Sequence, residues 1–189
     1  MVGDQLKRIG VLALQGDFEA HEKALAKAGA EPVTVRTPRE LRSVDGLVLP
    51  GGESTTMLNL LHRLEMFEPL REFGKSKPIF GTCAGVILLA KQVTHPEQES
   101  LNLMDLTVER NGYGRQIDSS VGDIRFGPDK LEAVFIRAPV ILRTGPDVKV
   151  LAEYRGHPVL VEQGLHLGAT FHPELSSDVR VHRLFLDKL

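Results

Sequence analysis

The chain has 189 residues, of which 42% are hydrophobic and 25% are charged, and its formal net charge is −2. This length and composition are typical of a globular protein, so we expect one domain over residues 1–189. Charges of both signs are interspersed without a basic stripe, which argues against nucleic acid as a partner. No apolar run approaches the roughly 20 residues that span a bilayer, which argues against a membrane protein.

The chain contains a single cysteine, Cys83. A lone thiol excludes an internal disulfide and every zinc site that needs several cysteines, and it fits a reducing compartment. The polar segment Met1–Arg8 lacks the apolar core of a signal peptide. We therefore expect a cytoplasmic protein.

The first half of the chain alternates short apolar runs with amphipathic stretches. This alternation predicts βαβ units and a parallel sheet with helices on both faces. The predicted strands are Ile9–Leu14, Pro32–Val35, Gly46–Leu49 and a short run around Ile79. The predicted helices are Asp17–Ala28, a segment from Thr55 or Thr56 towards Leu64, Met66–Phe73, and one that begins after Cys83.

The second half is rich in short β segments separated by Gly, Pro or Asp turns. These segments predict mixed or antiparallel additions to the same sheet. They are Leu106–Glu109, Ala133–Ile136, Val148–Tyr154, Pro158–Glu162 and Leu167–Phe171. A final helix is predicted over Asp178–Leu186, where the apolar spacing becomes helical again.

Cys83 lies in Gly81-Thr82-Cys83-Ala84-Gly85, between one apolar run and the next. This pattern predicts a buried strand, a turn too tight for Cβ atoms on its flanks, and a helix, which is the cysteine form of a nucleophile elbow. The alternative is a small buried thiol of the kind found in many protein cores. A nearby histidine and an orienting carboxylate decide between the two interpretations.

Such a pair occurs in Phe171-His172-Pro173-Glu174, at the end of a predicted strand. In an extended backbone residues i and i+2 project to the same side, so Glu174 is expected to reach the imidazole of His172. The chain has six other histidines, namely His21, His62, His95, His157, His166 and His182. We expect His21 and His62 to be solvated on helices, and His166 is the nearest alternative base.

The segment Leu49-Pro50-Gly51-Gly52-Glu53-Ser54 follows another predicted strand. A Gly-Gly turn at a strand end presents backbone N–H groups to an oxyanion, so we expect Gly51 and Gly52 to form an oxyanion hole with the N–H of Ala84. The alternative is a plain strand-to-helix turn with Ser54 or Thr55 as the N-cap. The two interpretations are compatible.

Taken in order, these motifs resemble the class I glutamine amidotransferase family, and within it the glutaminase subunits of pyridoxal 5′-phosphate synthase. The narrower resemblance also rests on Gly10–Gly16, Val108–Asn111 with Tyr113–Gln116, and Phe135–Pro139. It implies an α/β, flavodoxin-like three-layer sandwich around a mostly parallel sheet. It also implies hydrolysis of L-glutamine to glutamate and ammonia, with no metal or organic cofactor. The implied partner is a (β/α)₈-barrel synthase subunit in a hetero-oligomer, which uses the ammonia to build pyridoxal 5′-phosphate.

By this resemblance Cys83 is the nucleophile, His172 the general base and acid, and Glu174 the orienting carboxylate. The glutamine-binding positions implied in the same way are Gly52, Glu53, Ser54, Arg110, Ile136 and Arg137. Gln15 is implied to lie near the oxyanion loop and the synthase interface. Either Arg110 or Arg137 suits the α-carboxylate of glutamine, because an arginine fork binds a carboxylate with two hydrogen bonds.

Three other functions fit parts of the pattern. The first is the glutaminase of another amidotransferase, such as imidazole glycerol phosphate synthase, which shares the same triad. The second is a cysteine peptidase of the same fold class, and the third is a binding module without activity. The His-Pro-Glu motif and the resemblance to a glutamine pocket disfavour the peptidase, and the intact set of Cys83, His172 and Glu174 disfavours the binding module.

Overall fold

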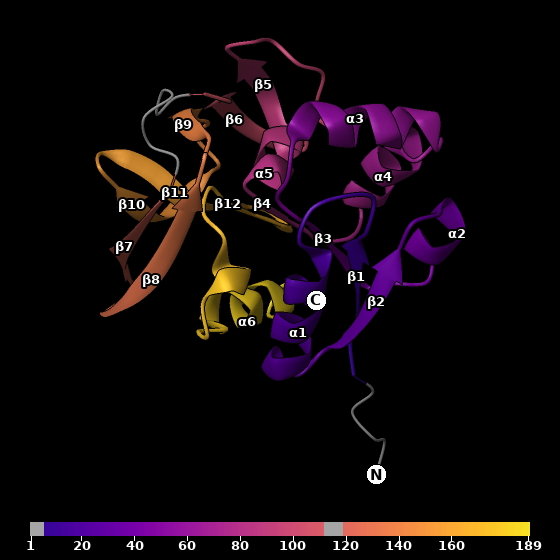
Figure 1. The fold of residues 1–189 in the computed structure, drawn as a ribbon, viewed down its shortest axis with the longest axis horizontal. Coiled ribbons are helices and arrows are strands. Elements are labelled where there is room, and N and C mark those ends of the chain that lie inside the picture. The colour runs from indigo at the N-terminus through magenta and orange to yellow at the C-terminus, as the bar shows by residue number, and fades with distance from the viewer. Residues whose placement is uncertain (1–5, 112–118) are drawn as a thin grey trace.

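The computed structural model describes residues 6–111 and 119–189. Its centre is a seven-stranded sheet in the order β10-β11-β12-β4-β3-β1-β2 (Figure 1). The strands from β12 to β2 are parallel, whereas β11 and β10 extend the sheet in antiparallel pairing. The prediction of an α/β fold around a mostly parallel sheet is therefore confirmed.

The elements of the first half agree with the predicted alternation. The strands are β1 (Arg8–Leu12), β2 (Glu31–Val35), β3 (Gly46–Leu49) and β4 (Ile79–Thr82). The helices are α1 (Phe18–Ala28), α2 (Pro38–Leu41), α3 (Ser54–Arg63), α4 (Phe67–Gly74) and α5 (Ala84–Leu89). Helix α2 was not predicted, because its single turn depends on a capping box between Thr37 and Glu40 rather than on apolar spacing.

The second half differs more from the prediction. Its strands are β5 (Ala90–Thr94), β6 (Met104–Glu109), β7 (Ser119–Phe126), β8 (Asp129–Ile136), β9 (Val140–Thr144), β10 (Lys149–Tyr154), β11 (His157–Gln163) and β12 (His166–Ala169). They are followed by a short 3₁₀ helix, η1 (Pro173–Leu175), and by α6 (Arg180–Leu186). The Tyr113–Gln116 part of the sequence resemblance lies outside the described residues.

Only β10, β11 and β12 join the central sheet, so the prediction that all the later strands extend it was wrong. Strands β5, β6 and β9 form a three-stranded sheet, and β7 and β8 form a separate antiparallel pair. The β7 strand has one buried residue and is exposed at every second position, so it lacks the apolar run that marks a buried strand. Sheet membership also depends on pairing between distant segments, which a local pattern does not specify.

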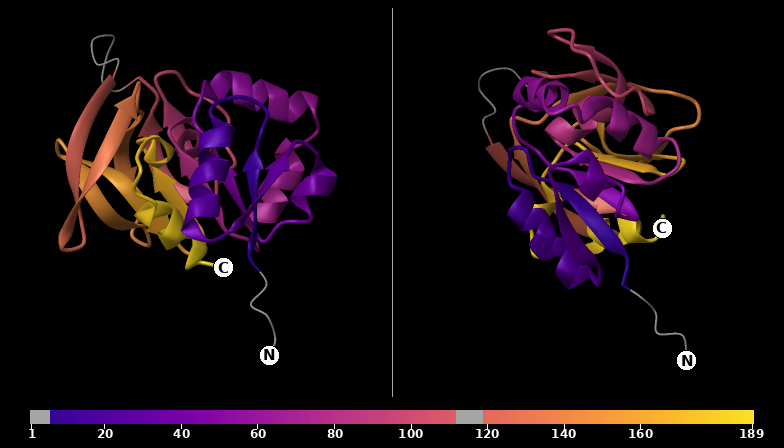
Figure 2. Two further views of the ribbon diagram at one scale, coloured as in Figure 1. Left: turned by 60° about the horizontal axis from the view of Figure 1, so that its bottom comes forward. Right: turned by 90° about the vertical axis from the view of Figure 1, so that its right-hand side faces the viewer.

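Helices cover both faces of the central sheet (Figures 1 and 2). Helices α1 and α6 contact each other on one face, and their core includes Leu25 and Phe185. The β7–β8 pair joins this core through Ile124 and Leu131, while α3, α4 and α5 pack with the β5–β6–β9 sheet in a second core. Within the described residues, no helix has the length and apolar character needed to cross a membrane.

The order of the central strands determines where the predicted site residues lie. Strands β3, β4 and β12 are neighbours and run parallel, so their carboxyl ends share one edge of the sheet. The Gly51-Gly52 turn follows β3, Cys83 follows β4, and His172 comes shortly after β12. Ligands of open α/β sheets bind at this kind of edge.

Candidate active site

Cys83 occupies a strained turn between β4 and α5. Its backbone has φ 48° and ψ −106°, a conformation that non-glycine residues rarely adopt. The Cys83 N–H donates to the Ala169 carbonyl of β12 at 2.8 Å, which ties the turn to the neighbouring strand. A Cβ on Gly85 would collide with the Leu49 carbonyl oxygen, so the turn requires glycine at this position. The predicted nucleophile-elbow geometry is present.

His172 and Glu174 form a close pair behind the thiol. His172 Nδ1 lies 2.7 Å from Glu174 Oε1, and both residues are buried. The backbone N–H of His172 donates to the Val134 carbonyl at 2.8 Å, which ties the main chain at this residue to β8. The expected contact is therefore present, but the expected extended backbone is not. Residues 173–175 form η1, and this turn brings the carboxylate back to the ring.

The electrostatics of His172 favour its cationic form. Burial lowers its pKa, but the interactions with the Cys83 sulfur and the Glu174 carboxylate outweigh burial and raise the pKa to about 10. His172 is therefore protonated at neutral pH. Both nitrogens are then donors, so Nδ1–H donates to Glu174 while the other ring nitrogen remains available on the cavity side.

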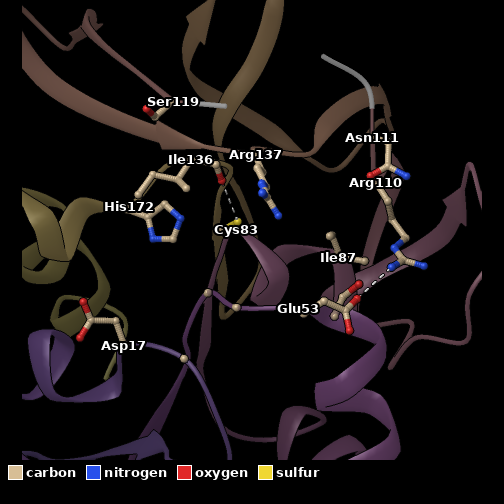
Figure 3. A pocket seen from close by; sticks show the side chains of 14 residues that line it. Asp17, Glu53, Cys83, Ile87, Arg110, Asn111, Ser119, Ile136, Arg137 and His172 are labelled. Atoms are coloured by element: carbon tan, nitrogen blue, oxygen red, sulfur yellow. Dashed lines mark hydrogen bonds and ion pairs between the residues drawn. The ribbon is translucent and has the colours of Figure 1, made fainter. Parts of the chain in front are cut away.

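The Gly51 turn closes around this pair. A Cβ built on Gly51 would lie 2.5 Å from His172 Cε1 and 3.4 Å from Cys83 Cβ, so glycine is needed for the three groups to meet. Figure 3 shows the imidazole beside Cys83, with the Ile136 carbonyl above the sulfur in this view. The distance from Cys83 Sγ to Ile136 O is 3.8 Å. Ala84 is the first residue of α5, so its N–H has no partner inside that helix.

These groups face an open cavity of about 830 Å³. Most of the predicted site residues line it, namely Gly51, Gly52, Glu53, Ser54, Cys83, Arg110, Ile136, Arg137 and His172. Glu174, Ala84 and Gln15 do not line the cavity. Five other residues for which no role was predicted also line the cavity, namely Gly16, Asp17, Ile87, Asn111 and Ser119.

Glu53 and Arg110 form an ion pair at the opposite side of the cavity from His172 (Figure 3). Arg110 Nη2 lies 3.1 Å from Glu53 Oε1 and 2.8 Å from Thr55 Oγ1. Glu53 is also the N-cap of α3, where it accepts hydrogen bonds from the N–H groups of Thr55 and Thr56. The plain-turn alternative placed Ser54 or Thr55 at the N-cap, and this was wrong because Glu53 holds that position. Burial raises the pKa of Glu53, but hydrogen bonds from Thr56 and Thr55 lower it to about 2.

Gln15 lies beneath the Gly51-Gly52 turn rather than in the cavity. Its Nε2 donates to the Glu53 carbonyl at 2.8 Å. A Cβ on Gly52 would lie 2.6 Å from the same nitrogen, so the Gln15 side chain is packed against the turn. Gln15 therefore holds the backbone that we expect to serve the oxyanion.

Three of the other histidines differ in their surroundings. His62 is half exposed and pairs with Glu99 at 2.7 Å, as expected for a surface residue. His166 is buried, but its Nδ1 faces the Ile79 N–H at 3.3 Å and it does not line the cavity. The prediction that His21 is solvated was wrong, because His21 is 0% exposed and lies 3.3 Å from Glu174. Its position on the apolar face of α1, with Ala24 and Leu25, is the signal that could have placed it in the core.

The sheet order and the cysteine elbow define a protein of the class I glutamine amidotransferase type. A solved structure of PurLQS from Thermotoga maritima shares this fold, with a TM-score of 0.74, 18% identity, and coverage of 97% of this chain and 99% of the other. The model of the SNO glutamine amidotransferase family matches residues 11–189. The chain therefore belongs to the SNO glutamine amidotransferase family.

Relatives with high identity agree with this assignment. A Solibacter usitatus protein named pyridoxal 5′-phosphate synthase subunit PdxT is 58% identical over 97% of this chain and 100% of its own length. A protein of the same name from Koribacter versatilis is 55% identical over 95% of this chain and 94% of its own. A crystal structure described as glutamine amidotransferase has a TM-score of 0.90 at 45% identity, covering 95% of this chain and 97% of the other.

Proposed function

We propose that this chain is the glutaminase subunit of a pyridoxal 5′-phosphate synthase and that it hydrolyses L-glutamine to L-glutamate and ammonia. The observation that carries the proposal is the meeting of Cys83, His172 and the Gly51 turn at one cavity. Family membership and the names of the relatives support the choice of substrate and pathway. We further propose that residues 1–189 act as one glutaminase domain, in the cytoplasm.

In the proposed mechanism Cys83 attacks the side-chain amide carbon of glutamine as a thiolate. The bond from sulfur to carbon forms, and the carbonyl electrons move to oxygen, which the N–H groups of Gly51 or Gly52 and Ala84 stabilise. His172 then gives its proton to the departing nitrogen, so ammonia leaves and a γ-glutamyl thioester remains. The imidazole next removes a proton from water, the hydroxide displaces the thiolate, and glutamate is released.

Glu174 has a supporting role in this sequence. Its Oε1 accepts the Nδ1–H of His172, so the imidazole keeps the tautomer whose other nitrogen faces sulfur and substrate. The negative charge also stabilises the imidazolium that stands ready to protonate the leaving group. We therefore propose Glu174 as the orienting member of a Cys83–His172–Glu174 triad.

The Glu53–Arg110 pair suits the amino acid end of glutamine. An α-ammonium and an α-carboxylate are opposite charges on one carbon, and they match an ion pair that presents one carboxylate and one guanidinium. Among the described residues Arg110 bonds to Glu53 and Thr55 through Nη2, and its other nitrogens suit a carboxylate. We propose that Arg110 binds the α-carboxylate, while Gly52, Ser54, Ile136 and Arg137 shape the cavity between the two ends.

Replacing Arg110 with methionine is expected to raise the KM for glutamine about 10- to 100-fold, because a charged hydrogen bond to the carboxylate is lost. The matched variant Arg137→Met, on the same cavity, is expected to change KM less. Steady-state kinetics of both variants give the comparison. A larger effect at Arg137 would assign the carboxylate to that residue instead.

The ammonia acceptor in this proposal is a (β/α)₈-barrel synthase subunit bound in a hetero-oligomer. We propose that Gln15 contributes to this interface and that docking aligns the Gly51-Gly52 turn, which prevents wasteful hydrolysis in the free subunit. The bond from Gln15 to the Glu53 carbonyl supports this proposal, because it links the N-terminal loop to the turn.

The test is ammonia release from L-glutamine by the purified chain, with and without a pyridoxal 5′-phosphate synthase subunit, and with Cys83→Ala as the background sample. Release that the synthase subunit stimulates is the expected result. Full activity without the synthase subunit would remove the docking proposal and favour another amidotransferase, such as the imidazole glycerol phosphate synthase glutaminase. No release above background in either setting would overturn the glutaminase proposal.

A further inference from the structure

A second layer of histidines lies behind Glu174, away from the cavity. His21 on α1 and His182 on α6 are both 0% exposed, and His21 Nδ1 lies 3.1 Å from His182 Nε2. On its other side, His21 Nε2 lies 3.1 Å from Thr82 Oγ1 and 3.3 Å from Glu174 Oε2. The proposed mechanism gives none of these groups a role.

Glu174 needs a partner in this layer. Its Oε1 is paired with His172, but within the described part of the chain Oε2 is buried without a hydrogen bond of regular geometry. The ring nitrogen of His21 lies within ion-pair distance of this oxygen. A buried carboxylate oxygen with no donor is costly, so the nature of the His21 contact determines how well the charge of Glu174 is supported.

The hydrogen bonds distinguish the two neutral tautomers of His21. If His21 carries its proton on Nε2, this N–H faces Thr82 Oγ1 and Glu174 Oε2, and Nδ1 accepts from the Nε2–H of His182. His182 Nδ1, which has no partner among the described residues, is then an unprotonated acceptor. If the proton is on Nδ1 of His21, its Nε2 lone pair faces the carboxylate, and His182 Nδ1 becomes a buried donor without an acceptor. The first tautomer avoids both penalties.

The surroundings keep His21 neutral. The titratable groups that face it are His182 from α6 and His172 and Glu174 from the segment after β12, while Thr82 and the Phe80 ring face it from β4. Burial, His182 and His172 lower the pKa of His21 well below its usual value, and burial lowers the pKa of His182 to about 4. Neither ring adds a charge at neutral pH, so among the groups behind His172 only Glu174 balances its imidazolium.

We propose that His21 is a positioning residue of the glutaminase site, whose neutral imidazole presents Nε2–H to the outer oxygen of Glu174, and that His182 fixes the tautomer that makes this possible. The proposal rests on the proposed function, because it assigns His21 a task in the reaction of Cys83 and His172. This contact gives the outer oxygen a polar partner, so the carboxylate remains aimed at His172 Nδ1.

The kinetic test compares His21→Met with His21→Gln in the complex with the synthase subunit. Methionine fills the volume without a donor, whereas glutamine carries an amide N–H that can point to the same oxygen. For His21→Met we expect kcat to fall about 10- to 100-fold, because Glu174 and His172 are less well aimed.

The KM for glutamine is expected to stay near the wild-type value, because His21 does not line the cavity. Glutamine at position 21 is expected to restore most of kcat. His166→Met is the matched control, since it removes another buried histidine that lies outside the cavity. A fall in stability with kcat unchanged, or a fall in kcat that is equal in His21→Met and His166→Met, would reduce His21 to a structural residue.

A second measurement is made on the wild-type chain. It requires no glutaminase activity and does not depend on whether His21→Met folds. Nitrogen-15 NMR of the labelled wild-type histidines reports which ring nitrogen carries the proton, with His21→Gln and His182→Gln used for assignment. We expect a neutral Nε2–H tautomer for both His21 and His182. A proton on Nδ1 of His21 would overturn the proposal even if the chain is a fully active glutaminase. Absence of glutaminase activity in the wild type would instead refute the proposed function. The NMR spectrum would still report the tautomers of His21 and His182, so the two failures are distinguishable.

Discussion

Replacing Cys83 with alanine is expected to abolish ammonia release in the synthase complex, with a loss of at least about 10⁴-fold, because alanine cannot form the bond to the amide carbon. The same substitution is expected to lower the pKa of His172 from about 10, because the sulfur is one of the two groups that raise it. The imidazole signal of His172, followed by NMR titration in the free subunit, measures this second effect without any turnover.

Activity and the His172 pKa test different parts of this prediction. Cys83→Ala removes only the sulfur from a buried position, so the thermal unfolding midpoint shows whether the strained turn still forms. A folded variant with wild-type activity would exclude Cys83 as the nucleophile. A His172 pKa that does not change would show that the two side chains do not interact as the structure indicates, even if activity is lost.

The elbow could be predicted from the sequence because its causes are local. Small residues on both sides of Cys83 permit a close approach to β3, and the collision of a Gly85 Cβ with the Leu49 carbonyl gives the physical reason. The parallel order of β3, β4 and β12 then brings the Gly51 turn and His172 to the same edge. The alternation of strands and helices in the sequence predicted this parallel sheet.

The predictions that were wrong concern contacts between segments that are far apart in the chain. The pairing of β7 with β8, and of β6 with β5 and β9, was missed, because short half-exposed strands carry little sign of their partners. His21 was placed in solvent because one polar residue on a helix is usually exposed. Its partners come from β4, η1 and α6, up to 161 positions away in the chain, and no local pattern identifies them.

Replacing Glu174 with glutamine tests how the two histidine layers work together. The side chain keeps its size, and the His21 N–H is expected to attract the amide oxygen, so the amide NH₂ faces His172 Nδ1. Nδ1 must then accept rather than donate, which places the proton of a neutral imidazole on the nitrogen that faces Cys83. That ring cannot take a proton from the thiol or from water, so we expect kcat to fall about 10³- to 10⁴-fold.

The pH dependence provides the more specific outcome for Glu174→Gln. The carboxylate raises the pKa of His172, so its removal lowers that pKa, and the imidazolium is lost at lower pH. The His172 pKa of about 10 predicts an alkaline limb of kcat/KM near that pH in the wild type, and this limb is expected to move to lower pH in the variant. Glu162→Gln is the matched control, because it breaks an ion pair with Lys188 outside the cavity and should leave the limb in place. An alkaline limb that stays near its wild-type position in Glu174→Gln would mean that Glu174 fills space behind His172 without controlling its proton.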